Sequence, residues 1–331
     1  MNRQLMKYGE HTMESKINVK LLSMAGQGGS AFGIGLMNLI QEHPEIMVLS
    51  SDMSTPAGLD KFKAVYPYRF MNVGIAEQNM IGIAAGLADE GYKPICVAQA
   101  CFITMRSFEQ IRQYCGYMGI PMVLVGIGSG LSLQYMGNTH YALEDLALMR
   151  TIPGMTVVAP CDSLEALKSL ETAVVHDGSV YIRLYGGTGI PAVYREDYQF
   201  EFGKAVSLRE GSEIQIISTS SMVGNALKVA DELEDEGVSA SVVNMHTLKP
   251  LDESVIDKNK KLIVTIEEHR EIGGLGSAVE SVLSGQSNAP VLYKIGIKDQ
   301  FSSVGSYQFL LEQTGLDVKS IKHSIIKVIN N

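Results

Sequence analysis

The acidic residue with the most suggestive surroundings is Glu77, which lies in the run Asn-Val-Gly-Ile-Ala-Glu-Gln-Asn-Met over residues 72–80. The spacing of apolar residues predicts a helix over 76–89, with Glu77 at its start and Ile75 and Met80 close by. A carboxyl group in apolar surroundings is better able to hold or share a proton, and this suits general acid–base chemistry. The dipole of a helix also favours an acid in its first turn, so the position alone indicates no function.

Two ring-bearing side chains are further candidates. Phe102, in the segment Ala-Cys-Phe-Ile over residues 100–103, offers a flat apolar surface for a ligand ring or for the core, and Phe108 is a second candidate for the same role. His140 ends the segment Gly-Asn-Thr-His over residues 137–140. Its imidazole could hydrogen-bond a hydroxyl or transfer a proton, or it could be a structural histidine.

Strand and helix patterns alternate through the first half of the chain. Short, almost continuously apolar runs predict strands over residues 46–50, 94–98, 122–127, 155–159 and 180–184. Apolar residues at helical spacing predict helices over residues 76–89, 106–116, 142–150 and 163–176. This alternation predicts a parallel sheet that helices cover on both faces.

The second half repeats the pattern after a stretch rich in glycine and proline. Strands are predicted over residues 213–218, 239–245, 262–267 and 291–295, and helices over residues 222–237, 276–283 and 318–329. The sequence therefore predicts an α/β protein with two domains, each a mostly parallel sheet flanked by helices. The predicted parts are an N-terminal arm over residues 1–17, a first domain over 18–190, a linker over 191–203 and a second domain over 204–331.

Composition excludes several classes of protein. The net charge is −9 with no basic cluster, which argues against nucleic acid as a partner. No apolar run approaches the roughly 20 residues of a membrane span. The four cysteines form no Cys-x-x-Cys pair, and free thiols favour a cytoplasmic location.

The chain resembles the transketolase family from about residue 20 onward. The run over residues 72–80 is very close to the pyrimidine-binding segment of that family. Further matches follow in order: Glu-Gln-Ile-Arg at 109–112, Thr-His-Tyr-Ala-Leu-Glu-Asp at 139–145, Ile-Pro-Gly-Met-Thr-Val at 152–157, Lys-Pro-Leu-Asp at 249–252 and Glu-Glu-His-x-x-x-Gly-Gly-Leu-Gly at 267–276. The resemblance implies a pyrimidine-binding domain followed by a transketolase C-terminal domain.

The resemblance also implies a cofactor, thiamine diphosphate, and roles for five residues. Glu77 would be the catalytic acid that hydrogen-bonds the aminopyrimidine ring and activates the cofactor. Phe102 would stack on that ring, and Ile75 and Arg106 would complete the cofactor-binding wall. His140 would be catalytic and would contact the oxygens of the sugar substrate.

One half of a complete transketolase is missing. The sequence contains no Gly-Asp-Gly segment, which in the family holds magnesium and the diphosphate. Diphosphate needs a metal ion or cationic groups at close range. We therefore expect a separate diphosphate-binding subunit that holds most of the Mg²⁺, an α2β2 heterotetramer, and activity only in the presence of that partner. This chain itself is expected to hold no metal.

The family's sugar-phosphate ligands are also absent at several positions. Gly29, Gly128 and Gly186 stand where the family has cationic side chains, and Pro56 stands where it has a serine. Met136, in the substrate channel, replaces an aspartate that reads a sugar hydroxyl. The resemblance implies transfer of a two-carbon ketol unit, and these changes predict that the substrate is unphosphorylated or otherwise atypical.

Three alternatives stay open at this point. The subunit could belong to a carboligase similar to deoxyxylulose-phosphate synthase or to the β subunit of pyruvate dehydrogenase. It could be a non-catalytic regulatory subunit. Finally, Arg183 or the partner could supply the cations that the three glycines do not.

Overall fold

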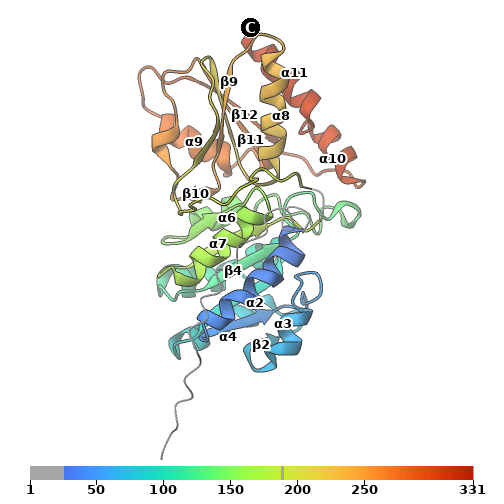
Figure 1. Ribbon diagram of the computed structural model, residues 1–331, viewed down its shortest axis with the longest axis vertical. Helices are drawn as coiled ribbons and strands as arrows, with labels where there is room; N and C mark the ends of the chain where they lie inside the picture. The colour runs from blue at the N-terminus through green and yellow to red at the C-terminus, as the bar shows by residue number, and fades with distance from the viewer. Residues whose placement is uncertain (1–25, 188–189, 331) are drawn as a thin grey trace, which may run out of the picture.

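A computed structural model describes residues 26–187 and 190–330 of the chain. Figure 1 shows two α/β bodies stacked along the long axis, with the C-terminal half uppermost. The predicted arm over residues 1–17 lies outside the described residues. Within the described ranges, no helix is both long and apolar enough to cross a membrane.

The first sheet has seven strands in the order β10-β5-β6-β4-β3-β1-β2. Its strands are β1 (Ile46–Ser50), β2 (Phe70–Asn72), β3 (Lys93–Gln99), β4 (Val123–Ile127), β5 (Thr156–Val158), β6 (Val180–Leu184) and β10 (Thr247–Lys249). All neighbouring pairs are parallel except β10 with β5. Every residue of β4 and β6 is buried, as expected for central strands with both faces covered.

Helices cover both faces of this sheet. One face packs against α2 (Phe32–Glu42), α3 (Asp60–Val65) and α7 (Ser163–Val175). The opposite face packs against α4 (Glu77–Asp89), α5 (Phe108–Ile111) and α6 (Asp145–Thr151). Asp162 is the N-cap of helix α7, and its carboxylate accepts the backbone N–H of Glu165.

The second sheet has five strands in the order β12-β11-β8-β9-β7. They are β7 (Val206–Arg209), β8 (Ile214–Ser218), β9 (Ala240–Asn244), β11 (Leu262–Arg270) and β12 (Val291–Ile297). Among the described residues of this sheet, the pair of β7 with β9 is antiparallel and the other pairs are parallel. One face packs against α8 (Val223–Glu234), α10 (Tyr307–Thr314) and α11 (Val318–Ile329). The other face carries α9 (Leu275–Leu283), which lies on the opposite side from α8 in Figure 1.

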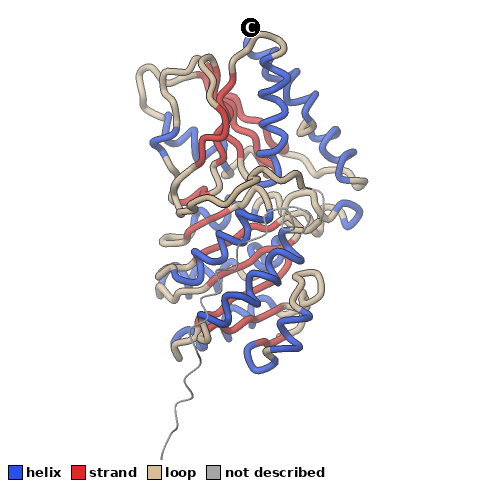
Figure 2. The backbone as a smooth tube through the Cα atoms, viewed as in Figure 1, coloured by secondary structure: helices blue, strands red, loops and turns tan. Residues whose placement is uncertain are grey.

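The architecture confirms the predicted α/β class with two mostly parallel sheets, which the backbone trace of Figure 2 separates clearly. Three short strands were not predicted: β2, β7 and β10. Strand β10 lies in the range that the sequence analysis gave to the second domain, yet it pairs with β5 of the first sheet. The apolar cluster that includes α4 and α6 likewise continues onto α9, so this cluster is shared by the two halves.

The helix predicted over residues 106–116 begins earlier than expected. A π-helical segment, Phe102–Arg106, follows β3 closely, and Ser107 interrupts the helical path before α5. A second π-helical segment covers Arg112–Tyr117. The early start places Phe102 next to the end of β3. π-Helical turns of this kind are frequent at functional sites.

Candidate active site

A pocket of about 200 Å³ lies beyond the carboxyl ends of strands β1 and β3. Its lining residues all come from the first half of the chain: Ser51, Asp52, Met53, Ile75, Glu77, Gln99, Phe102 and His140. Parallel sheets commonly bind ligands at this edge, because the loops that follow neighbouring strands converge there. The pocket brings together four residues that the sequence analysis selected from the motifs.

Glu77 is the first residue of α4, and only 2% of it is exposed. Met80 and Ile81 of the same helix are completely buried, whereas Ile75 is 75% exposed at the rim. The predicted apolar surroundings are therefore present on one side. On the other side, Nη1 of Arg106 lies 2.7 Å from Oε2 of Glu77, so the carboxylate has a cationic partner that sequence reasoning had not paired with it.

Contacts link this ion pair to the two ring-bearing candidates. The Arg106 guanidinium lies 4.2 Å from the centroid of the Phe102 ring, within the range of a cation–π interaction. His140 also contacts that ring, edge-on, with 5.4 Å between ring centroids. Glu77, Arg106, Phe102 and His140 thus form one continuous series of contacts around the pocket.

His140 is partly buried, and its orientation is fixed by its own loop. Its backbone N–H donates to the carbonyl of Gly137, and its Nδ1 lies 2.8 Å from the hydroxyl oxygen of Thr139. The other ring nitrogen, Nε2, has no hydrogen-bond partner among the described residues. It is therefore the atom that a substrate hydroxyl could use.

A hydrogen-bonded turn at the end of β1 holds residues that the sequence analysis missed. Asp52 has a positive φ of 54°, and its backbone N–H donates to the side-chain oxygen of Asn72. The hydroxyl of Ser51 donates to the carbonyl of Gly74 and accepts the N–H of Ala76. These bonds join the ends of β1 and β2 and fix the start of α4, which carries Glu77.

Gln99 is another lining residue that the sequence analysis missed, as is Met53. Gln99 ends β3 and is 8% exposed, and its side-chain nitrogen has no hydrogen-bond partner in the described part of the chain. A buried donor without a partner is unfavourable unless a ligand or water accepts from it. The side-chain nitrogen of Gln99 could therefore donate a hydrogen bond to a polar acceptor on a ligand in the pocket.

Two other residues from the sequence analysis lie elsewhere. Met136 is 52% exposed in a 3₁₀ turn and does not line the pocket, so its role in the substrate channel stays a prediction. Arg183 is 1% exposed, and its Nε lies 2.9 Å from Oδ2 of Asp145. Its Nη2 donates to the carbonyls of Ala142 and Glu268. The idea that Arg183 supplies a cation to the substrate is therefore wrong.

The three glycines at positions where the family has cations differ in the space around them. A Cβ on Gly186 would lie 2.7 Å from the Cα of Gly128. A Cβ on Gly128, which has a φ of +80°, would lie 2.9 Å from the side chain of Leu133. At Gly29 the nearest atom is 3.6 Å away, an ordinary contact. Two of the three positions thus have no room for a side chain without movement of their neighbours.

Comparison with protein families gives two matches that together cover most of the chain. "Transketolase, pyrimidine binding domain" matches residues 27–186. "Transketolase, C-terminal domain" matches residues 203–321. The pocket and all its lining residues fall within the first match.

Similar proteins cover nearly the whole chain. The chain is 38% identical over 290 residues to the 6-deoxy-6-sulfo-D-fructose transketolase subunit SqwH of Clostridium sp. strain MSTE9, covering 86% of this chain and 89% of that protein. It is 33% identical to a subunit of the apulose-4-phosphate transketolase of Phocaeicola vulgatus, covering 89% and 95%. It is also 36% identical to a 1-deoxy-D-xylulose-5-phosphate synthase of Chlorobium phaeovibrioides, but spans only 47% of that protein.

Solved structures agree with these matches. A split-gene transketolase, described as an inactive β4 tetramer, is 38% identical, with a TM-score of 0.81 over 90% of this chain and 96% of that one. The transketolase of Campylobacter jejuni has a TM-score of 0.75 at 18% identity, and this chain covers 49% of it, which shows a shared fold. From the family matches, the relatives and these structures, the chain belongs to the transketolase family and comprises its pyrimidine-binding and C-terminal domains.

Proposed function

We propose that this chain is the C-terminal subunit of a split transketolase, which transfers a two-carbon ketol unit between carbonyl compounds together with a partner subunit. The observation that carries the proposal is the convergence of Glu77, Phe102 and His140 on one pocket of the pyrimidine-binding domain. Two relatives of similar length are named as transketolase subunits, which supports the same division into two chains.

The pocket residues fit the aminopyrimidine part of thiamine diphosphate. Glu77 would hydrogen-bond a ring nitrogen, Phe102 would pack against the ring, and Ile75 would cover its exposed side. The side-chain N–H of Gln99, which lacks a partner among the described residues, would suit an acceptor on the ligand. When bound, the cofactor supplies an acidic ring carbon and an electron sink.

The chain's own residues would then act on protons and on placement. Glu77 would hold a proton next to the cofactor's ring nitrogen, and Arg106 would fix the orientation of that carboxylate through their contact. His140 would hydrogen-bond a substrate hydroxyl through Nε2 and take or return a proton there. The edge-on contact with Phe102 would keep the imidazole at the pocket.

The partner would supply the diphosphate half of the site. The sequence has no Gly-Asp-Gly segment to hold Mg²⁺ and diphosphate, so we assign both to an N-terminal subunit in an α2β2 complex. A tetramer of β subunits alone is described as inactive for one similar chain, which supports the need for a partner. The cytoplasmic location expected from the composition stays a prediction, as do the boundaries 18–190, 191–203 and 204–331.

We further propose an unphosphorylated or otherwise atypical sugar as substrate. A phosphate carries close to two negative charges near neutral pH and needs several cationic partners. Gly128 and Gly186 offer no cation and little room for one, and Arg183 is engaged in the interior. Relatives at similar identity are named for different sugars, one a sulfo sugar and one a sugar phosphate, so identity alone does not fix the substrate.

A deoxyxylulose-phosphate-synthase-like carboligase is the second candidate. The observation in its favour is the 36% identity to such a synthase, close to the value for the transketolase subunits. This chain spans about half of that enzyme's length, whereas it spans most of each transketolase subunit. The matched length favours the split transketolase.

Reconstitution tests the proposal. The subunit would be co-purified with the chain that carries Gly-Asp-Gly, and the complex would be assayed with ketose and 2-keto acid donors, each sugar with and without phosphate. We expect transfer of a two-carbon unit from a ketose, with unphosphorylated sugars used at least as well as phosphorylated ones. Activity on 2-keto acids alone would favour the carboligase, and a clear preference for sugar phosphates would exclude the atypical substrate.

A further inference from the structure

The loop that carries His140 is closed at its base by two backbone hydrogen bonds. The N–H groups of Gly130 and Ala142 each donate to the carbonyl of the other residue. Between them, residues 131–141 contain one 3₁₀ turn, Gln134–Met136. We call residues 131–141 the histidine loop.

The tip of the histidine loop is bound to the second half of the chain. The side-chain nitrogen of Asn138 donates to the carbonyl of Ser302 over 2.7 Å, and the N–H of Ser302 donates back to the Asn138 oxygen over 3.0 Å. The hydroxyl of Tyr141 lies close to the carbonyl of Gln134 within the loop and also 3.2 Å from the carbonyl of Ser303. Gly137 lies against Val304, since a Cβ on Gly137 would lie 3.1 Å from that side chain.

The base of the loop is bound to the second half as well, through Glu268 of strand β11. Glu268 is 1% exposed, and its Oε1 accepts the backbone N–H of Leu131 over 2.6 Å. Its Oε2 accepts the hydroxyls of Tyr307, over 2.7 Å, and Ser221. Gly130 has a φ of +62°, and a Cβ there would lie 2.4 Å from Oε1 of Glu268. The carboxylate and the loop are therefore in close contact.

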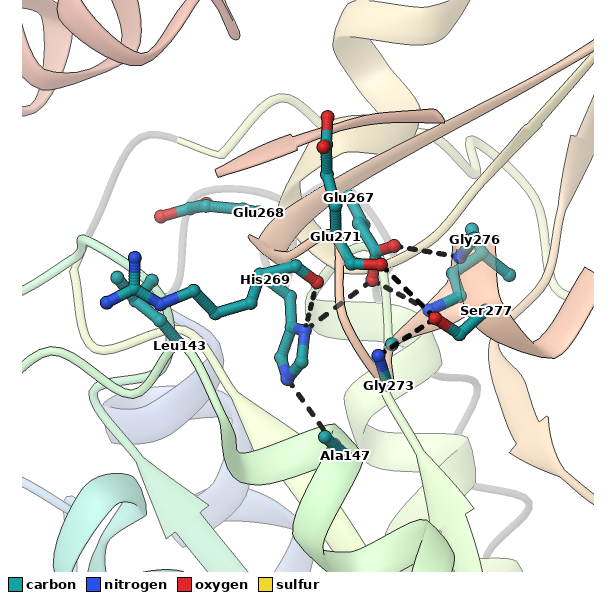
Figure 3. Close-up of polar contacts among 12 residues, drawn as sticks. Leu143, Ala147, Glu267, Glu268, His269, Glu271, Gly273, Gly276 and Ser277 are labelled. Carbon is teal, nitrogen blue, oxygen red and sulfur yellow. Dashed lines mark hydrogen bonds and ion pairs between the residues drawn. The ribbon is translucent and has the colours of Figure 1, made fainter. Parts of the chain in front are cut away.

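The two neighbours of Glu268 on β11 make different contacts. Side chains alternate along a strand, and Figure 3 shows Glu268 pointing away from His269 and from the contacts made by Glu267. Glu267 accepts the N–H groups of Leu275 and Gly276 at the start of α9. The Nε2 of His269 accepts the N–H of Ala147 on α6 over 3.4 Å, so neither neighbour holds the histidine loop.

We propose that the second half of the chain positions the substrate-binding histidine: Glu268, Tyr307 and the backbone of Ser302 hold the histidine loop in the place where His140 faces the pocket. The proposal rests on the proposed function, because it gives the C-terminal domain a part in the substrate affinity of that same site. None of the pocket's lining residues comes from the C-terminal domain. Its influence would pass through these hydrogen bonds.

The proposal explains why the loop can be long and still precise. The ring of His140 is held in its own domain by Thr139 and by an edge contact with Phe102. Those contacts orient the ring but do not bind the loop to the second half of the chain. The hydrogen bonds at Leu131 and Asn138, on either side of the turn, do so.

Hydrogen–deuterium exchange on the subunit alone tests the anchoring directly. Asn138→Ala removes both bonds to Ser302 at an exposed position, and Tyr307→Phe removes one hydroxyl while keeping the ring. We expect faster exchange in peptides covering 131–141 for both variants. Glu267→Gln is the matched control, since it alters a neighbouring buried carboxylate that does not bind the loop. Unchanged exchange in both loop variants overturns the proposal.

Kinetics in the reconstituted complex test the consequence. We expect both loop variants to raise the KM of the sugar by roughly three- to tenfold, the effect of one lost hydrogen bond, with a smaller change in kcat and an unchanged cofactor Kd. Faster exchange with an unchanged KM would overturn the link to substrate binding. A wild-type complex that transfers no two-carbon unit would overturn the proposed function, while the exchange experiment would still decide the anchoring.

Discussion

The guanidinium of Arg106 and the carboxylate of Glu77 form an ion pair at 2.7 Å, 29 positions apart in the chain. The side chain of Glu77 is almost completely buried, and that of Arg106 is 43% exposed. The pair lies at the pocket, next to the ring of Phe102. Its position makes the charge and orientation of Glu77 the first features to test.

Glu77→Gln should nearly abolish turnover in the reconstituted complex while leaving the subunit folded. Glutamine keeps the shape and a hydrogen bond but cannot share a proton with the cofactor ring. Loss of one acid–base group costs on the order of 10² to 10⁴ in rate. The measurement is kcat, with Glu90→Gln, just after the C-terminal end of α4, as the control that should keep full activity. Activity at the wild-type level in Glu77→Gln would remove this residue from the mechanism.

Arg106→Ala should weaken cofactor binding by the complex. The substitution removes a charge-assisted hydrogen bond to Glu77 and the cation over Phe102. Because the guanidinium is partly exposed, we expect a loss of about 1 kcal/mol, or roughly fivefold in Kd. Arg106→Lys keeps the charge without the planar stacking, so its cofactor Kd should lie between those of the wild type and Arg106→Ala. Tighter binding by Arg106→Ala would mean that the arginine competes with the cofactor for Glu77.

Gly186→Ala should lower the unfolding midpoint, and Gly29→Ala should not. The added methyl group at Gly186 would press on the backbone of Gly128, whereas the one at Gly29 would meet only an ordinary contact. Overpacking of this kind typically costs roughly 1–3 kcal/mol. Chemical denaturation of the two variants makes the comparison. Equal midpoints would show that the loop at Gly186 accommodates a Cβ after all.

The pH dependence of stability should differ between the wild type and Glu267→Gln. Burial raises the pKa of Glu267 to about 7 from a usual value of 4.5. The folded state therefore keeps a proton that the unfolded chain releases, so the contribution of Glu267 is fully present below about pH 4.5 and is lost as the pH rises through about 7. Glutamine does not titrate. The free energy of unfolding of Glu267→Gln, relative to that of the wild type, should therefore rise by about 3 kcal/mol between about pH 4.5 and pH 7.

Denaturant unfolding near pH 5 and near pH 8 provides the measurement. The neutral His269, whose pKa burial lowers to about 4, is present in both proteins, and its own titration should largely cancel in the difference. A difference that stays constant between the two pH values would show that Glu267 is ionised throughout.

Much of the fold could be predicted from local patterns, because the central strands are continuous apolar runs. Val180–Leu184 and Val318–Ile329 have the predicted bounds. Strand β10 could not be found in this way, since it has three residues and its partner β5 lies about 90 positions earlier. Its strand character comes from that distant pairing.

In the candidate site, likewise, some residues could be predicted from the sequence and others could not. Glu77, Phe102 and His140 were found because distinctive motifs surround them, although their roles remain predictions. Ser51 and Gln99 were missed, because a polar residue at the end of a strand looks like the start of any loop. Only the side-by-side arrangement of β1 and β3 brings these two residues into one pocket.

In the proposed function, this chain supplies one wall of a thiamine diphosphate site and a partner supplies the other. Calorimetric titration of the cofactor, with and without Mg²⁺, into the subunit alone and into the complex with the Gly-Asp-Gly chain tests it most directly. We expect negligible binding by the subunit alone and tight, magnesium-dependent binding by the complex. Micromolar, magnesium-dependent binding by the subunit alone would contradict it.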